Sequence, residues 1–284
     1  MPTTIWEPST SRALCVRVSR EAPHGKDARQ RQQPRRTRDG VPVMAVETEE
    51  TAVRPRVVST GSSEIDKKMG GGIPEGSLIL IEGSSNSGKS VVTQQLLYGA
   101  LNSGARCVLY TTENTPRSLF RQMDSLSLGI LDFYLLGSFN VYPVPAAMSP
   151  ETASTAFHKL LDHIGSLRGK FDIIFIDSMT SFVSQMPEAA TLQFLTAIKN
   201  FVDDNMTVFF TLHTFAFDEA MFMRIRSLCD AHLRLRVEEM GEKLVKVLEV
   251  AKVRGAAKTT GNIISFDVDP GLGMKIIPIS KAKA

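Results

Sequence analysis

The chain has 284 residues, of which 43% are hydrophobic and 22% charged, which is ordinary for a soluble globular protein with room for one large α/β domain. No apolar run approaches the roughly 20 residues that span a bilayer, and the Arg-rich N-terminus lacks the apolar segment of a secretory signal. The cysteines, Cys15, Cys107 and Cys229, are odd in number and far apart. They exclude a disulfide framework and a zinc site and indicate a reducing cytoplasm.

Charge is distributed unevenly along the chain. Residues 1–43 hold nine Lys/Arg and four Asp/Glu, a net charge of +5, whereas the remaining 241 residues carry a net charge of −2. Because residues 1–56 show almost no apolar periodicity, they are predicted to form a disordered basic extension. A nucleic-acid-binding arm is one interpretation. The sequence favours a plain solvated extension, or a translation start placed too early, with Met44 as the alternative start.

An ordered domain is predicted over residues 57–279, with a short tail at 280–284. Ile65 and Met69 share one face of a short helix, and the glycines at 70–72 cannot continue that helix. A Pro-Glu-Gly turn then leads into the apolar run SLILIE, which is typical of a buried strand.

The stretch GSSNSGKS follows this strand and precedes SVVTQQLLYGAL, whose apolar spacing predicts a helix that begins near Gly88. It fits G-x-x-x-x-G-K-[ST] between a strand and a helix, the context that a phosphate-binding loop requires. The glycines let backbone N–H groups surround a phosphate, Lys89 is expected to reach the β- and γ-phosphates, and Ser90 to ligate Mg²⁺. The predicted nucleotide-binding residues are Gly83, Ser84, Ser85, Asn86, Ser87, Gly88, Lys89 and Ser90.

Strands and helices alternate through most of the remaining chain. This alternation predicts an α/β fold with a mostly parallel sheet and helices on both faces. The last strands follow one another closely, so they are expected to form antiparallel hairpins at the edge of the sheet. Further strands are predicted at 106–112, 139–143, 172–176, 207–212, 231–238, 244–252 and 262–268, and helices at 89–103, 116–128, 150–167, 187–203 and 217–229.

Polar residues end three of these strands. Asp177 ends FDIIFID, where a carboxylate can hold Mg²⁺ through water, although an Asp can also cap the following segment. Glu113 follows VLYTT and is expected to face the γ-phosphate as a general base for an attacking water. The alternative for Glu113 is to cap the helix that starts near Pro116. His213 ends another strand and either senses the γ-phosphate or is a structural histidine.

Four segments together carry a family resemblance: STGSSEIDKKMGGGIPEGSLILIEGSSNSGKS, TTENTP, FIDS and AKVRG. They resemble the KaiC-like branch of the RecA-type ATPases and, within it, the FlaH or ArlH family, the accessory ATP-binding proteins of the archaellum (the archaeal flagellum). The resemblance extends from about Val57 to Pro278. It implies one RecA-like P-loop NTPase domain that binds ATP and Mg²⁺ between the subunits of a homo-oligomeric, hexameric ring. The implied partners are the archaellum motor ATPase and the membrane platform protein, at the cytoplasmic face of the membrane.

The resemblance also implies roles for single residues. Lys252 and Arg254 alternate with Val253 and share one strand face, which by itself is typical of a solvated surface. In KaiC-like proteins this Lys-x-Arg pair reaches the γ-phosphate of the neighbouring subunit, so the pair is implied to act as a catalytic finger. KaiC-type domains often place two adjacent glutamates where this chain has Glu113 followed by Asn114. This difference predicts slow hydrolysis or none.

Two other functions stay open at this point. A clock-like ATPase and autokinase would need an acceptor Ser or Thr near the neighbour's γ-phosphate and usually a tandem second domain, but the chain has one phosphate loop. A RecA- or RadA-like DNA-binding ATPase would need long DNA-binding loops, yet no Lys or Arg lies between Asp177 and Lys199, and the body is slightly acidic. We therefore expect no direct nucleic-acid partner and favour a nucleotide-dependent switch in the archaellum motor.

Overall fold

The computed structural model describes residues 56–145, 149–240, 243–256 and 262–278. The predicted N-terminal extension, apart from Arg56, lies outside these residues, as do Met44 and the predicted tail at 280–284. Within the described part of the chain, no helix combines the length and the apolar character needed to cross a membrane.

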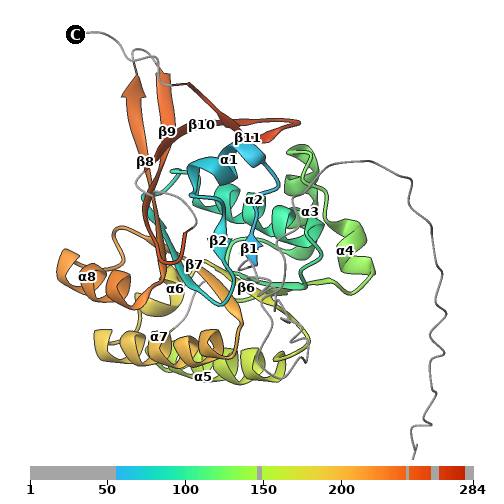
Figure 1. The fold of residues 1–284 in the computed structure, drawn as a ribbon. Coiled ribbons are helices and arrows are strands. Elements are labelled where there is room, and N and C mark those ends of the chain that lie inside the picture. The colour runs from blue at the N-terminus through green and yellow to red at the C-terminus, as the bar shows by residue number, and fades with distance from the viewer. Residues whose placement is uncertain (1–55, 146–148, 241–242, 257–261, 279–284) are drawn as a thin grey trace, which may run out of the picture. The chain divides into compact units, whose positions relative to one another are not determined.

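A nine-stranded sheet forms the centre of the domain, and a separate two-stranded ribbon pairs its first two strands (Figure 1). The strands are β1 (Val57–Val58), β2 (Ile73–Pro74), β3 (Leu78–Gly83), β4 (Cys107–Thr111), β5 (Phe139–Pro143), β6 (Ile173–Asp177), β7 (Thr207–His213), β8 (Ala231–Met240), β9 (Lys243–Val253), β10 (Ile263–Asp269) and β11 (Gly273–Ile276). The sheet order is β11-β10-β9-β8-β3-β7-β6-β4-β5. The strands from β8 to β5 in this order run parallel, and β9, β10 and β11 continue the sheet antiparallel. The predicted fold class, with antiparallel C-terminal hairpins, is therefore confirmed.

Helices cover both faces of this sheet (Figure 1). They are α1 (Ser63–Lys68), α2 (Lys89–Asn102), α3 (Pro116–Ser125), α4 (Leu131–Leu135), α5 (Pro150–Ser166), α6 (Thr180–Val183), α7 (Glu188–Asp203) and α8 (Glu219–Leu228). Successive residues of a strand point to opposite faces, so in β3 Ile79 and Ile81 join the core under α2 and α3, while Leu78 and Leu80 join the core under α5 and α7. All four side chains are fully buried, as is typical of a parallel strand covered on both faces.

Two of the helices that begin beside the sheet's carboxyl edge, α3 and α8, have side-chain caps. Thr115 Oγ1 accepts a hydrogen bond from the backbone N–H of Ser118, and Pro116 occupies the first position of α3. The Asp218 carboxylate accepts from the backbone N–H of Met221 at 2.8 Å and so starts α8. These caps start α3 and α8 only a few residues after β4 and β7 end, so the connecting loops stay at the edge of the sheet.

The shortest elements are where structure and prediction differ. The helix predicted over 116–128 ends at Ser125, and the chain then forms α4, which the sequence did not predict. The elements β1, β2, α6 and β11 were also not predicted, and each has four residues or fewer. Segments of this length carry too few residues for a periodic pattern, so packing against the sheet decides their conformation.

Candidate nucleotide-binding site

The phosphate loop joins the end of β3 to the start of α2 in the middle of the sheet. A β-carbon at Gly83 would lie 2.5 Å from Ser87 Oγ and 2.6 Å from the carbonyl oxygen of Leu235, so the fold requires glycine at this position. Gly88 has a φ of 95°, and a β-carbon there would lie 3.0 Å from Phe266. Both glycines keep open a backbone cradle of the kind that receives phosphate.

Lys89 is the first residue of α2 and is only 6% exposed. Its Nζ donates to the carbonyl oxygens of Gly83 at 3.2 Å and Ser84 at 2.8 Å. Burial lowers the pKa of Lys89, and the nearby charges of Asp177 and Glu113 oppose that change. The ammonium group is therefore held over the loop, close to two carboxylates, where a bound nucleotide would bring its phosphates.

Asp177 is the last residue of β6 and is buried. Its Oδ1 accepts a hydrogen bond from Thr211 Oγ1 at 2.7 Å. Burial raises the pKa of Asp177 to about 6, and Glu113 adds to the increase, whereas hydrogen bonds from Thr211 and Ser90 and the charge of Lys89 reduce it. Ser90 and Asp177 offer the hard oxygen donors that Mg²⁺ prefers, so these two residues fit the ion. When bound, Mg²⁺ would neutralise charge on the phosphates.

Glu113 lies just beyond β4 and, together with Lys89 and Ser90, lines a cavity beside the phosphate loop. Ser90 Oγ donates to Glu113 Oε2 at 3.4 Å, and the backbone N–H of Glu113 donates to Thr111 Oγ1 at 3.2 Å. The following Asn114 is engaged elsewhere, because its Oδ1 accepts from Ser118 Oγ at 3.1 Å. Thr115, rather than Glu113, caps α3. This geometry favours the cavity-facing role of Glu113 over the capping alternative.

His213 lies on β7, which in the sheet separates the phosphate-loop strand β3 from the Asp177 strand β6. The ring lines the cavity, and its Nδ1 lies 3.1 Å from Thr180 Oγ1. Burial lowers the pKa of His213, the charge of Lys89 lowers it further, and Glu113 opposes both. The imidazole is therefore neutral at pH 7, beside the place where the outer phosphates would lie.

The cavity lined by Lys89, Ser90, Glu113 and His213 measures about 600 Å³, and part of its wall was not predicted from the sequence. Gln122 on α3 and Lys246 on β9 both line it. Lys246 Cδ lies 3.1 Å from the position that a β-carbon on Gly88 would take, so this lysine lies over the phosphate loop. In the sequence Lys246 is one charged residue in an alternating strand, and no local signal distinguishes it from a solvated lysine.

Lys252 lies at the C-terminal end of β9, and Arg254 follows in the turn after the strand rather than on its face as predicted. The cavity of their own subunit is lined by other residues of the described chain. Lys252 Nζ donates to the carbonyl oxygens of Arg226 at 3.2 Å and Cys229 at 2.6 Å, at the C-terminal end of α8. Arg254 forms an ion pair with Asp230 at 3.3 Å. Any contact of this pair with a phosphate would therefore be made to a nucleotide of another subunit.

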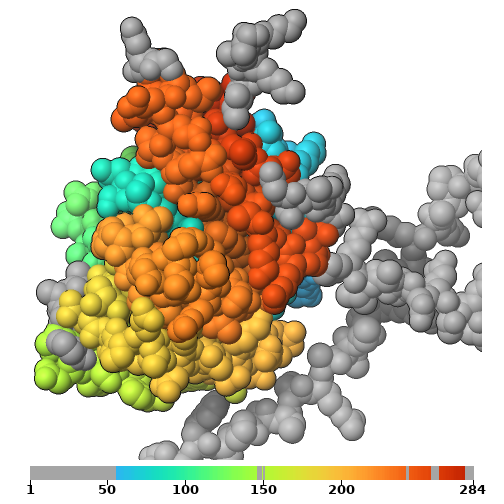
Figure 2. Space-filling model, turned by 90° about the vertical axis from the view of Figure 1, so that its left-hand side faces the viewer, coloured from blue at the N-terminus to red at the C-terminus, as the bar shows by residue number. Residues whose placement is uncertain are grey.

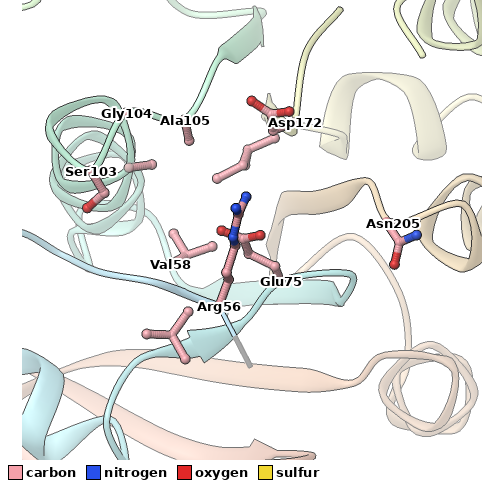
Figure 3. Close-up of a pocket in the computed structure, with 11 residues that line it drawn as sticks. Arg56, Val58, Glu75, Ser103, Gly104, Ala105, Asp172 and Asn205 are labelled. Carbon is pink, nitrogen blue, oxygen red and sulfur yellow. The ribbon is translucent and has the colours of Figure 1, made fainter. Parts of the chain in front are cut away.

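A second cavity, of about 630 Å³, lies at the opposite edge of the sheet, where the parallel strands begin. Figure 3 shows Arg56, Glu75 and Asp172 among the residues that line it, with the Arg56 side chain directed toward Asp172. Burial raises the pKa of Asp172, but hydrogen bonds from Arg106 and the charge of Arg56 outweigh it and hold the pKa below its usual value. Since the phosphate loop and the strand-end acids are at the other edge, this cavity is not the nucleotide site.

The strand order, the phosphate loop and the acid at the end of β6 define a RecA-type P-loop nucleotide-binding domain, and the model of the KaiC family of ATPases matches residues 58–281. Over 230 residues the chain is 34% identical to the archaeal flagellar ATP-binding protein FlaH of Sulfolobus acidocaldarius, a match that covers 80% of this chain and 100% of the relative. Identity to FlaH of Methanocaldococcus jannaschii is 26%, over 77% of this chain and 94% of the relative.

Among solved structures, the flagellar accessory protein FlaH from Methanocaldococcus jannaschii has the same fold. It superimposes with a TM-score of 0.71 at 24% sequence identity, covering 78% of this chain and 100% of that one. The chain therefore belongs to the FlaH family of KaiC-type ATPases. This finding confirms the family resemblance predicted from the motifs.

Proposed function

We propose that the protein is an ATP-binding ring component of the archaellum motor that acts as a nucleotide-dependent switch. The relatives named above are archaeal flagellar ATP-binding proteins. The observation that carries the proposal is the cavity lined by the phosphate loop, Ser90 and Glu113, with the buried Asp177 hydrogen-bonded to Ser90 behind its wall, which together offer a site for ATP with Mg²⁺. Its partners would be the motor ATPase and the membrane platform protein, at the cytoplasmic face of the membrane, with no direct nucleic-acid contact.

Switching requires binding energy more than rapid turnover. A ligand present at a hundred times its dissociation constant stabilises the bound state by about 2.7 kcal/mol. Slow hydrolysis is supported by the side-chain arrangement, because Glu113 faces the cavity while Asn114 bonds to Ser118. The site therefore has one carboxylate at this strand end to polarise a water, in place of a pair.

Ring closure in the proposal uses the C-terminal end of β9 and the turn that follows it. Lys252 and Arg254 would complete the nucleotide site of the adjacent subunit, since they lie away from the cavity of their own. A head-to-tail contact of this kind joins two unlike surfaces and repeats around a ring, for which we propose six subunits. Arg254 is 58% exposed in its pair with Asp230, and such exposed pairs contribute little stability. The guanidinium can therefore exchange Asp230 for a γ-phosphate at small cost.

Light scattering coupled to size-exclusion chromatography tests this assembly. Wild-type protein should assemble with Mg-ATP and less with Mg-ADP, because only ATP places a γ-phosphate between subunits. Arg254→Ala should bind ATP through the phosphate loop but assemble at higher protein concentration than wild type. Arg168→Ala is the matched control, because Arg168 also forms an exposed ion pair, with Asp204. Equal assembly of Arg254→Ala and wild type at all concentrations would remove Arg254 from the interface.

A further inference from the structure

Phe215 is an aromatic side chain that the fold holds in solvent beside the nucleotide cavity. The side chain is 71% exposed, but its turn is fixed on both sides. The backbone N–H of Thr214 donates to the carbonyl oxygen of Gly83 at 3.2 Å, and that of Ala216 donates to His213 at 2.9 Å. The Phe215 ring also packs against the His213 ring, with centroids 5.0 Å apart. An exposed aromatic ring with this little freedom loses little entropy when a partner covers it.

The position of Phe215 follows from the order of the strands. Its turn leaves the end of β7, between the phosphate loop on β3 and Asp177 on β6. His213, which contacts the Phe215 ring, lines the cavity together with Lys89 and Glu113. A surface that closes over this side of the cavity would therefore meet Phe215.

We infer that Phe215 is an anchor for a second copy of this chain, which covers the nucleotide cavity when ATP is bound. The inference rests on the proposed function, because that function places a neighbouring subunit over the cavity. Large aromatic side chains at the centre of interfaces commonly dominate the binding energy. Because the turn is bonded to Gly83 and His213, the phosphate loop and the cavity wall set the position of the anchor.

The opposing surface has an exposed aliphatic side chain that can receive the ring. Lys252 lies on β9, which forms hairpins with β8 and β10, and Figure 2 shows β8 and β9 at the molecular surface above α8. On β10, Ile263 is 46% exposed and pairs with Glu249, three positions before Lys252. One subunit thus offers an aromatic ring on a fixed turn beside its cavity, and the surface proposed to meet it offers the exposed aliphatic side chain of Ile263 on the strand next to Lys252.

The experiment compares Phe215→Ser with Leu135→Ser in the full chain. Leu135 on α4 is also 71% exposed, so the two changes remove equally exposed apolar side chains. We expect both variants to keep the wild-type circular dichroism and to bind Mg-ATP in dilute solution by calorimetry. With Mg-ATP, Phe215→Ser should need at least about tenfold more protein to assemble by light scattering, as loss of an interface anchor predicts. Leu135→Ser should assemble as wild type does.

A second variant tests whether the side chain at position 215 is covered by the neighbouring subunit or by the nucleotide. In a Trp6→Phe background, Phe215→Trp should assemble with ATP, and its protection from acrylamide quenching should rise with protein concentration. If ATP protected this tryptophan from acrylamide equally at all protein concentrations, the nucleotide rather than a second copy of the chain would cover it, and the inference would be wrong. Wild-type assembly by Phe215→Ser, with Arg254→Ala impaired, would overturn the anchor and leave the ring intact. A wild-type chain that binds Mg-ATP and stays monomeric would overturn the ring and the anchor together.

Discussion

The cations at the nucleotide cavity come from distant parts of the chain. Lys89 starts α2 and is held by the loop carbonyl oxygens of Gly83 and Ser84. Lys246 arrives from β9, two strands away from β3, and is half-buried over Gly88. A nucleotide in this cradle would therefore meet positive charge from the loop and from the C-terminal hairpins.

Replacement of Lys246 by alanine should weaken ATP binding. A hydrogen bond to a charged group contributes about 1.5–3 kcal/mol, so the dissociation constant for Mg-ATP should rise at least about tenfold by calorimetry. Lys243→Ala is the control, because Lys243 is exposed at the start of the same strand. If the two variants bound Mg-ATP with equal affinity, Lys246 would line the cavity without contributing to nucleotide binding.

Replacement of Glu113 by glutamine should separate hydrolysis from binding. We expect wild-type turnover, measured as phosphate release, to stay below about 10 s⁻¹, the median for enzymes. Glu113→Gln should reduce any residual turnover by about 10² or more, since it removes the general base, while Mg-ATP still binds. Rapid wild-type turnover would contradict the switch, and unchanged turnover in the variant would contradict the base.

At the scale of elements, a buried ion pair joins α8 to the phosphate-loop strand. Glu82, fully buried and next to Gly83, accepts hydrogen bonds from Arg226 Nε at 2.9 Å and Nη2 at 2.8 Å. His232 Nε2 lies 3.3 Å from the same carboxylate. Burial raises the pKa of Glu82, but the nearby His232 and the hydrogen bonds and charge of Arg226 outweigh it and hold the pKa below its usual value of 4.5. The charged form of Glu82 therefore stabilises the fold.

Replacement of Glu82 by glutamine should change the dependence of stability on pH. Because the folded-state pKa is lowered, the stabilisation is present above pH 4.5 and is lost as pH falls through the folded value. In urea denaturation at neutral pH, Glu82→Gln should lower the free energy of unfolding by about 3–5 kcal/mol, because Arg226 loses its buried partner. As the pH falls, the free energy of unfolding of this variant should decrease less steeply than that of wild type.

Glu238→Gln is the control for this prediction, because Glu238 is 44% exposed in its ion pair with Arg236. Replacement of Glu238 should lower the free energy of unfolding by less than about 1 kcal/mol. If the free energy of unfolding of Glu82→Gln fell as steeply with decreasing pH as that of wild type, other carboxylates would control the stability in acid.

At the scale of the whole molecule, the described residues, which begin at Arg56, belong to one compact unit, and the family match starts at residue 58. Removal of residues 1–52 should therefore leave the melting temperature and the Mg-ATP affinity unchanged. Differential scanning calorimetry checks the first and isothermal titration the second. A fall of more than about 4 °C, which for a domain of this size corresponds to about 1 kcal/mol or more, would show that the extension stabilises the body.

The long elements were predictable because their signals are local. Helices of ten residues or more, such as α2 and α7, carry a periodic apolar face or a flanking motif, and the strands β3 and β6 are continuous apolar runs. The elements α4, α6 and β11 have five residues or fewer, and their conformation depends on the surface against which they pack. The same limit applies to the nucleotide site. The residues of the phosphate loop are adjacent in the sequence, whereas the other residues that line the cavity come from elements far apart in the chain.

The sequence by itself therefore determined the α/β class, the phosphate loop from Gly83 to Ser90, and the placement of Asp177 and Glu113 at strand ends. Each depends on contiguous residues whose spacing dictates their geometry. Only the tertiary structure decided that β7 lies between β3 and β6 and that Lys246 reaches Gly88. It likewise decided that Phe215 stands beside the cavity. These placements arise from pairing between strands far apart in the chain, and strand order is set by the packing of the whole sheet rather than by any local pattern.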